Sequence, residues 1–305
     1  MLRKLHQALF LYDHRMSTRS ARVQLLAAAL LFSTGGTAIK AVALTSWQIV
    51  AGRSLLAAFV IMLGGAGLWR GFSWRPVLVG VAQAATLVTF VTANKLTTAA
   101  NAVFLQATAP LYIALLGPFL LGEHMKRKDI PLLVLIFGGV LLLFAGSQEP
   151  LVTAPHRVLG TIVGVFSGFC WSLTVMGLRW IARADPVDGG NTARAAAVVG
   201  NLLAFLVCVP AALPMPAPGA ADVLGVIYLG VFQVGASYLL LSHGLRHVPA
   251  AAASLLLLAE PAFSPLWAWL VHHEAPGLWP LVGGTLIIAA ATIATWRDSR
   301  VPVLE

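Results

Sequence analysis

The sequence predicts an all-α polytopic membrane protein, with ten transmembrane helices arranged as two inverted five-helix repeats around a central cavity. Three observations lead to this fold class. The 305 residues are 59% apolar and only 10% charged, whereas a soluble domain has about 25% charged residues. The apolar residues form long continuous runs, which favour helices over the alternating pattern of a membrane barrel. One long stretch of the first half also recurs in the second half.

About ten apolar runs follow one another along the chain, and most approach the roughly 20 residues that cross the hydrocarbon core as a helix. The connections between them are short and leave no room for a soluble domain. The predicted spans are Val23–Ala43, Trp47–Trp69, Val77–Ala93, Ala99–Leu121, Ile130–Ala145, Leu159–Trp180, Ala193–Pro210, Val223–Leu241, Pro249–Val271 and Leu278–Trp296.

The repeated stretch covers Lys95–Glu123 and returns as Arg246–Glu274, 151 positions later and without a gap. Each copy is predicted to be an apolar helix with a proline near its middle, and Pro110 aligns with Pro261. Proline removes a backbone donor and frees a carbonyl one turn earlier. Repeated broken membrane helices are typical of transport sites, so Pro110 and Pro261 are the predicted helix-break and gating residues. The alternative is that they only kink the helices for packing.

Charge distribution gives the predicted orientation. With the N-terminus in the cytoplasm, sixteen of the 20 Lys and Arg residues lie inside, as the positive-inside rule requires. The net charge of +9 is therefore interpreted as a topology signal and not as a nucleic-acid-binding surface. Both termini are then cytoplasmic, and the second half enters the membrane from the opposite side because five is odd. The predicted segments are 1–21 (basic cytoplasmic lead), 22–146 (first repeat), 147–157 (linker), 158–297 (second repeat) and 298–305 (cytoplasmic tail).

Several short motifs occur in the same order as in a known family. They are FSTGG with Lys40 in the first span, AGRSLLAA around Arg53, TAPLY, LLGE, Gly138–Gly139, AEPAF and HHE. With these motifs the chain resembles the EamA-type carriers of the drug/metabolite transporter superfamily, over nearly its whole length. The resemblance implies ten helices, two EamA repeats and a cavity lined by the first four helices of each half, with the fifth and tenth helices peripheral. It also implies export or exchange of amino acids, related metabolites or drugs. One departure is that the second copy ends in HHE where the first ends in LGE.

Glu260 is the carboxylate placed deepest within an apolar run. An ionised acid at mid-membrane costs roughly 3 kcal/mol or more, so it must face a cavity, find a partner or be protonated. It is predicted either to contact a substrate amine or couple protons, or to be a polar anchor at the helix kink. Both interpretations stay open at this level.

Polar side chains within the spans are few, and a pocket for an amphipathic metabolite needs some of them among apolar walls. They are Gln83, Asn94, Asn101, Gln106, Gln233, Ser237 and His243. The predicted substrate-binding residues are Gln83, Trp171, Tyr238 and Glu260, because they fall near mid-depth of the third, sixth, eighth and ninth spans. Each could instead serve helix packing.

Three basic residues, Lys40, Arg53 and Lys95, lie near the predicted outer ends of spans. Long basic side chains in such places usually snorkel to the lipid headgroups. The alternative is a gate or a rim that attracts carboxylates.

The sequence therefore predicts a bacterial-type inner-membrane carrier that moves small amphipathic metabolites, with amino acids favoured, by alternating access. A multidrug or nucleotide-sugar-like carrier is the alternative within transport, and a non-transporting membrane receptor or assembly subunit is the alternative outside it. The chain has no H-E-x-x-H, G-x-S-x-G or glycine-rich phosphate motif, so neither an enzyme nor a metal or cofactor site is expected. The expected partners are a small-molecule substrate and membrane lipid, with no nucleic acid, and the protein is expected to be a monomer or homodimer.

Overall fold

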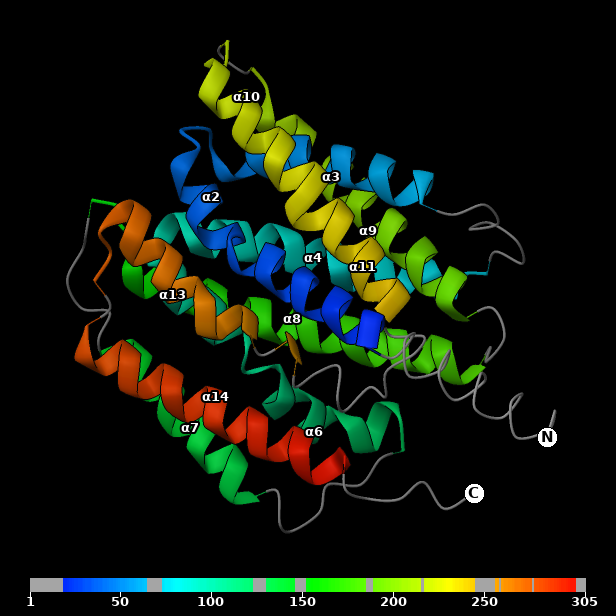
Figure 1. Cartoon of the computed structure of the whole chain (residues 1–305), viewed down its shortest axis with the longest axis vertical. Coiled ribbons are helices and arrows are strands. Elements are labelled where there is room, and N and C mark those ends of the chain that lie inside the picture. Colours follow the sequence, from blue (N-terminus) through cyan, green and yellow to red (C-terminus); the bar gives the residue numbers. More distant parts are fainter. Residues whose placement is uncertain are drawn as a thin grey trace, which may run out of the picture.

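A computed structural model of the whole chain shows a bundle of helices (Figure 1). The residues it describes are 19–64, 73–122, 130–145, 152–184, 189–214, 217–244, 256–257, 259–275 and 277–299. The labelled helices are α2 (Gly35–Ala41), α3 (Ser46–Leu63), α4 (Arg75–Leu96), α5 (Ala99–Gln106), α6 (Ala109–Leu120), α7 (Ile130–Ala145), α8 (Arg157–Ala184), α9 (Gly189–Ala212), α10 (Ala220–Ile227), η2 (Tyr228–Ala236), α11 (Ser237–Gly244), α13 (Ala259–His272) and α14 (Leu278–Ser299).

Six helical stretches within the described residues are long and apolar enough to cross a membrane. The first, Arg19–Ala41, ends as α2, and the last, Ala220–Leu241, joins α10, η2 and α11. The fourth, fifth and ninth predicted runs give shorter helices in the described part of the chain, and the tenth gives α14, whose apolar part is Leu278–Ala290. The all-helical class is confirmed, while the count of ten spans and the inverted arrangement of the halves stay predictions.

The fourth predicted run is two helices, not one. It is interrupted at Ala107–Thr108, between α5 and α6, and Pro110 falls in the first turn of α6. A proline is tolerated there because its missing N–H would have no intrahelical acceptor. Gly168 of α8 packs on the interruption, where an added Cβ would lie 2.6 Å from the Leu105 carbonyl oxygen. The interruption therefore faces a neighbouring helix of the second half.

The eighth predicted run also departs from a regular helix. Its middle, η2, is a π-helix, which no pattern in the sequence predicted. The Ser237 N–H and hydroxyl both donate to the Phe232 carbonyl oxygen, the hydroxyl at 3.2 Å. These two hydrogen bonds to one oxygen stabilise the wide turn. Wide turns of this kind occur often at functional sites.

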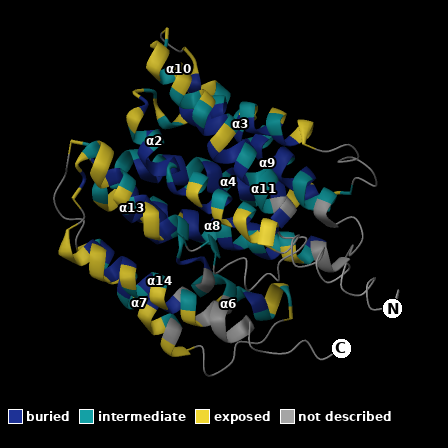
Figure 2. Cartoon of the chain, viewed as in Figure 1, coloured by how far each residue is buried: buried dark blue, intermediate teal, exposed yellow. Residues whose placement is uncertain are grey.

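Helices α3, α4, α8 and α9 form the middle of the bundle, where α4 packs on both α8 and α9. Glycines allow these close approaches: a Cβ on Gly80 of α4 would lie 3.0 Å from the backbone nitrogen of Gly200 on α9. Helices α7 and α14 pack mainly on each other, at the edge of the bundle (Figure 1). Both helices carry many exposed residues (Figure 2). These include large apolar residues, as expected for a lipid-facing surface.

The segments predicted to share one membrane face come together at one end of the bundle. Lys95 donates to the Val42 carbonyl, and the Ala43 N–H donates to Asp222 Oδ1 at 2.7 Å. Lys40 donates to the Thr153 carbonyl. We call this the Lys40 end. At the other end, Arg194 donates to the Gly64 carbonyl at 3.1 Å, which joins the end of α3 to the start of α9.

Candidate functional site

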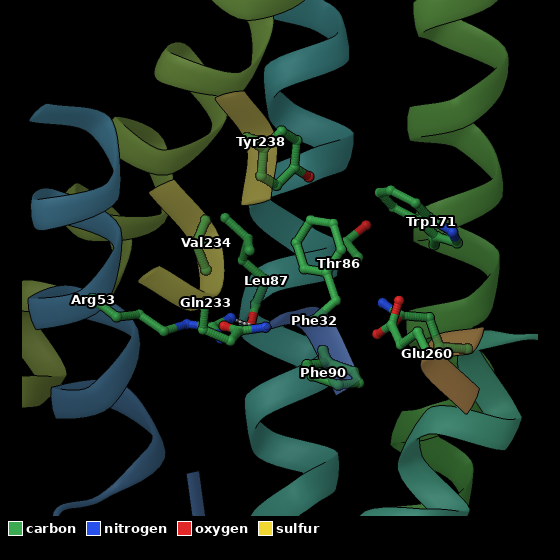
Figure 3. Close-up of a pocket in the computed structure, with 11 residues that line it drawn as sticks. Phe32, Arg53, Thr86, Leu87, Phe90, Trp171, Gln233, Val234, Tyr238 and Glu260 are labelled. Atoms are coloured by element: carbon green, nitrogen blue, oxygen red, sulfur yellow. Dashed lines mark hydrogen bonds between the residues drawn. The ribbon is translucent and has the colours of Figure 1, made fainter. Parts of the chain in front are cut away.

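A cavity of about 80 Å³ lies among helices of both halves (Figure 3). The first half contributes Phe32, Arg53, Thr86, Leu87, Phe90 and Gln106, and the second half contributes Trp171, Gln233, Val234, Tyr238 and Glu260. Side chains from two broken or irregular spans, α5 and η2, are among them. The cavity is therefore shared between the two halves and lies where the helix geometry is least regular.

Aromatic rings form much of the cavity wall. Phe32 meets Tyr238 edge to face, with ring centroids 5.7 Å apart. Phe90 and Trp171 line the same space from α4 and α8. Apolar walls with a few polar groups are typical of small-molecule sites.

Arg53 reaches the cavity from α3 and is only 1% exposed. The start of α3 is fixed by a capping box, in which the Gln48 N–H donates to Thr45 Oγ1 and the Thr45 N–H donates to Gln48 Oε1. Gly230 of η2 packs directly on Arg53, where an added Cβ would lie 2.8 Å from the Arg53 carbonyl oxygen. The guanidinium donates to the Leu87 carbonyl at 3.3 Å. The Arg53 side chain does not extend to the lipid headgroups, because α3 is packed closely against η2 at this residue and the side chain is buried.

Glu260 reaches the cavity from the first turn of α13, one residue before Pro261. The positive end of a helix dipole stabilises a carboxylate in that turn. Pro261 is buried, and like Pro110 it lies in the first turn of its helix. The residues immediately before it, 251–255 and 258, lie outside the described part of the chain. In both copies of the repeated stretch, the proline thus lies at the start of a helix and not in its middle.

Gln233 comes from the π-helix and is only 4% exposed. Gly35 of the FSTGG motif makes room for it, since a Cβ there would lie 2.6 Å from Gln233 Nε2. Gly36 does the same for Asn94, at 2.8 Å from Oδ1. The two glycines of the motif are thus needed for close packing of polar side chains around the first span.

An ion pair closes the Lys40 end. Lys40 Nζ lies 2.9 Å from Glu274 Oε1, and both side chains are almost fully buried, at 3% and 4% exposure. The Ala99 N–H, at the start of α5, donates to Glu274 Oε2 at 3.1 Å. His273 holds a left-handed backbone conformation (φ 54°) directly before Glu274. The pair joins the first span of one half to the end of α13 in the other.

Two further contacts join the first span to α13, between the ion pair and the cavity. His272 Nε2 donates to the Thr37 carbonyl oxygen at 2.8 Å, which requires the proton on Nε2. Trp267 Nε1 donates to Ser33 Oγ at 2.9 Å. Together with Lys40 and Glu274 they form a ladder of contacts between the first span and α13, leading from the Lys40 end toward the cavity.

Three of the four predicted lining residues, Trp171, Tyr238 and Glu260, meet at the cavity. Gln83 does not line it: its side chain packs on α9, where a Cβ on Gly200 would lie 2.9 Å from Gln83 Cβ. Arg53, Gln106 and Gln233 also line the cavity. The sequence analysis named Gln106 and Gln233 among the polar residues of the spans and Arg53 as a basic residue near a span end, but did not select them as substrate-binding residues.

The position of Arg53 relative to Trp47 was a usable signal. Six residues of helix place Arg53 about 9 Å deeper than an interfacial tryptophan, which is far for a side chain that snorkels. Lys40 and Lys95 are also not snorkelling residues, since both bind partners within the protein.

No group of three His, Cys, Asp or Glu side chains that could hold a metal ion occurs among the residues described. Cys170 and Cys208 are free and buried. The polar groups at the cavity are instead suited to hold a small polar solute by charge and hydrogen bonds.

The model of the EamA-like transporter family matches this chain twice, over residues 20–145 and 158–296. An uncharacterized transporter of Archaeoglobus fulgidus is 24% identical over 261 residues, which are 84% of this chain and 88% of the relative. A second uncharacterized transporter of the same organism is 28% identical over 214 residues, 70% of this chain and 73% of the relative.

A solved crystal structure superposes with a TM-score of 0.64 at 22% identity, covering 93% of this chain and 99% of that one, and shows a shared fold. The names of the relatives indicate transport rather than catalysis. The two matches of the family model together take in most of the chain and agree with the duplicated motifs. This chain belongs to the EamA-like transporter family, as its motifs predicted.

Proposed function

We propose that this membrane transporter is a secondary carrier that exports or exchanges small amphipathic metabolites, with amino acids as the favoured class. The observation that carries the proposal is the cavity of about 80 Å³, which both repeats line and in which aromatic walls surround Arg53, Gln233 and Glu260. A site at the interface of two repeats is where alternating-access carriers bind their solute.

The Lys40 end supports the alternating-access part of the proposal. The Lys40–Glu274 ion pair and the contacts of His272 and Trp267 join the two repeats on one side of the cavity. Opening that side requires these contacts to break, while the helix interruption at Ala107–Thr108 provides a place where the fourth span can bend. We assign the gating role to the segments that begin with Pro110 and Pro261. The two halves would be inserted with opposite orientation.

The test is counterflow in proteoliposomes. Purified protein is reconstituted with an unlabelled mixture of amino acids inside, and accumulation of labelled amino acids from outside is compared with protein-free liposomes. Accumulation that depends on the internal amino acids supports the proposal. Parallel arms with a nucleotide sugar and a cationic dye test the other carrier types. Absence of flux in every arm, with correctly folded protein, would favour a receptor or assembly subunit.

A further inference from the structure

Arg53 is a buried cation for which the described protein supplies no counter-ion. Its side chain is 1% exposed, and its guanidinium donates a long 3.3 Å hydrogen bond from Nη2 to the neutral Leu87 carbonyl. Its Nε has no hydrogen-bond partner among the described residues. A guanidinium has five N–H donors in a planar fork, so most of its binding capacity is unused.

Such an arrangement is costly in the absence of an anion. Removing a charge from water without pairing it costs several kcal/mol. The planar fork of Arg matches a carboxylate with two parallel hydrogen bonds. A buried Arg beside a cavity is therefore expected to bind an anionic group that enters the cavity.

The acid that lines the same cavity does not supply this anion. Glu260 and Arg53 are both described, and no ion pair is formed between them. Figure 3 shows them on opposite sides of the pocket, with Phe32 between them. The closely paired carboxylate of the described structure is Glu274, which binds Lys40 at the end of the bundle. The cavity thus presents a positive group and an acidic group separated by aromatic surface.

We propose that Arg53 is the carboxylate-binding residue of the transport site, and that the carrier selects solutes with a carboxylate at one side and an ammonium at the other. The solute carboxylate binds the Arg53 guanidinium, and its ammonium faces Glu260. The apolar part of the solute lies against Phe32, Trp171 and Tyr238. This inference rests on the proposed carrier function and adds the charge pattern that the solute must have.

The geometry also gives a matched control for Arg53. Arg194, near the start of α9, is a basic residue of the second repeat. It donates to the Gly64 carbonyl and to Asn191 Oδ1, at 3.1 Å and 2.5 Å. It does not line the cavity, so its replacement removes the same charge without touching the site.

The experiment compares three probes with the same apolar group. Phenylalanine carries both charges, phenethylamine lacks the carboxylate, and 3-phenylpropionate lacks the ammonium; leucine, isoamylamine and 4-methylpentanoate form a second set. Binding is measured by thermal stabilisation of the purified protein, because a ligand of the native state raises its melting temperature. Competition with counterflow gives the same comparison for transport. The proteins are wild type, Arg53→Gln, Arg53→Lys, Glu260→Gln and Arg194→Gln.

Wild type is expected to bind the zwitterion of at least one set roughly tenfold or more tightly than either of its single-charge analogues, the usual effect of a hydrogen bond to a charged group. Arg53→Gln is expected to remove the preference over the amine, and Arg53→Lys to retain part of it. Glu260→Gln is expected to remove the preference over the acid while leaving the preference over the amine. Arg194→Gln is expected to keep the wild-type ratios.

Equal binding of zwitterion and amine by wild type overturns the role of Arg53 but leaves a carrier in place, whereas no binding or flux of any probe removes the carrier proposal itself. An unchanged zwitterion-to-amine ratio in Arg53→Gln also overturns the inference. If Arg53→Gln does not fold, the Glu260→Gln variant provides the test. A preference for the zwitterion over the acid analogue that is as strong in Glu260→Gln as in wild type contradicts a site with Arg53 on one side and Glu260 on the other.

Discussion

Two pairs of residues each combine a basic residue of the first repeat with an acidic residue of the second. We call Lys40 and Glu274 the closed pair, and Arg53 and Glu260 the open pair. The first pair is in contact at 2.9 Å with both side chains buried, whereas the second pair lines a cavity without forming an ion pair. A buried charge that is paired holds two elements together. A buried charge that lines a cavity and has no ion-pair partner can instead bind an oppositely charged group of a solute that enters the cavity. The difference indicates which charges keep the carrier closed at one end and which hold the solute.

The largest expected effect comes from breaking the closed pair. Lys40→Met leaves the buried Glu274 carboxylate without its cation, and should lower the free energy of unfolding by about 3–5 kcal/mol. Denaturant titration in detergent measures this. The double variant Lys40→Met with Glu274→Met should recover most of the loss, because it removes both charges. A single variant as stable as wild type would show that the pair does not hold the Lys40 end closed.

The next effect tests the open pair. Glu260→Gln keeps the shape of the side chain and removes its charge, so amino-acid counterflow should fall by roughly 100-fold, the usual cost of a lost charge-assisted contact. Unfolding free energy should change much less than in Lys40→Met, since Glu260 has no ion-pair partner in the described structure. Wild-type flux and pH profile in this variant would return Glu260 to a structural role.

A smaller effect is expected where the first span meets the π-helix. The Cβ of Gly35→Ala would lie 2.6 Å from Gln233 Nε2, so the Gln233 side chain must move within the cavity. We expect a several-fold loss of transport and a stability cost of about 1–3 kcal/mol, typical of overpacking. Gly138→Ala is the control, because a Cβ there meets nothing within 4 Å. Equal transport by the two variants would contradict a role for Gln233 in the site.

The smallest effect concerns the turn that presents Glu274. His273 has φ 54°, and its counterpart in the repeated stretch, Gly122, has φ 67°. A non-glycine residue in this conformation costs of order 1 kcal/mol. His273→Gly should therefore raise the free energy of unfolding by up to about 1 kcal/mol and leave counterflow unchanged, as thermal unfolding can show. A marked loss of stability would mean that the His273 side chain, not the backbone, supports the turn.

Pro110 and Arg53 show which features of the structure the sequence could predict and which it could not. The fourth span is interrupted just before Pro110, as expected of a residue that cannot donate a helix hydrogen bond. Pro118 and Pro265 lie inside helices, however, so a proline alone does not mark a break. For Arg53 the sequence left two interpretations open, snorkelling to the headgroups or forming a gate or a carboxylate-attracting rim. The depth of its side chain depends on Gly230, which packs against it from a helix far along the chain. Arg194, a basic residue of the second repeat, lies near the start of α9.

The sequence predicted only some of the side chains that line the cavity. Trp171, Tyr238 and Glu260 reach the cavity, but Gln83 turns toward Gly200, since the side of α4 that faces the cavity depends on how α8 and α9 pack on it. The pair of Lys40 and Glu274 joins residues far apart in the chain, and the sequence showed only that both lie near span ends. The wide turn of η2 had no local pattern to reveal it.

The wide turn of η2 affects how the residues of this helix could move relative to the cavity. A π turn contains one more residue than an α turn, so shifting the extra residue along η2 rotates Gln233 and Val234 about the helix axis. Every peptide group can stay hydrogen-bonded within the helix during such a shift, as the lipid interior demands. We therefore expect that moving the extra residue by one position would change which of Gln233 and Val234 faces the cavity, without any sliding or tilting of the helix.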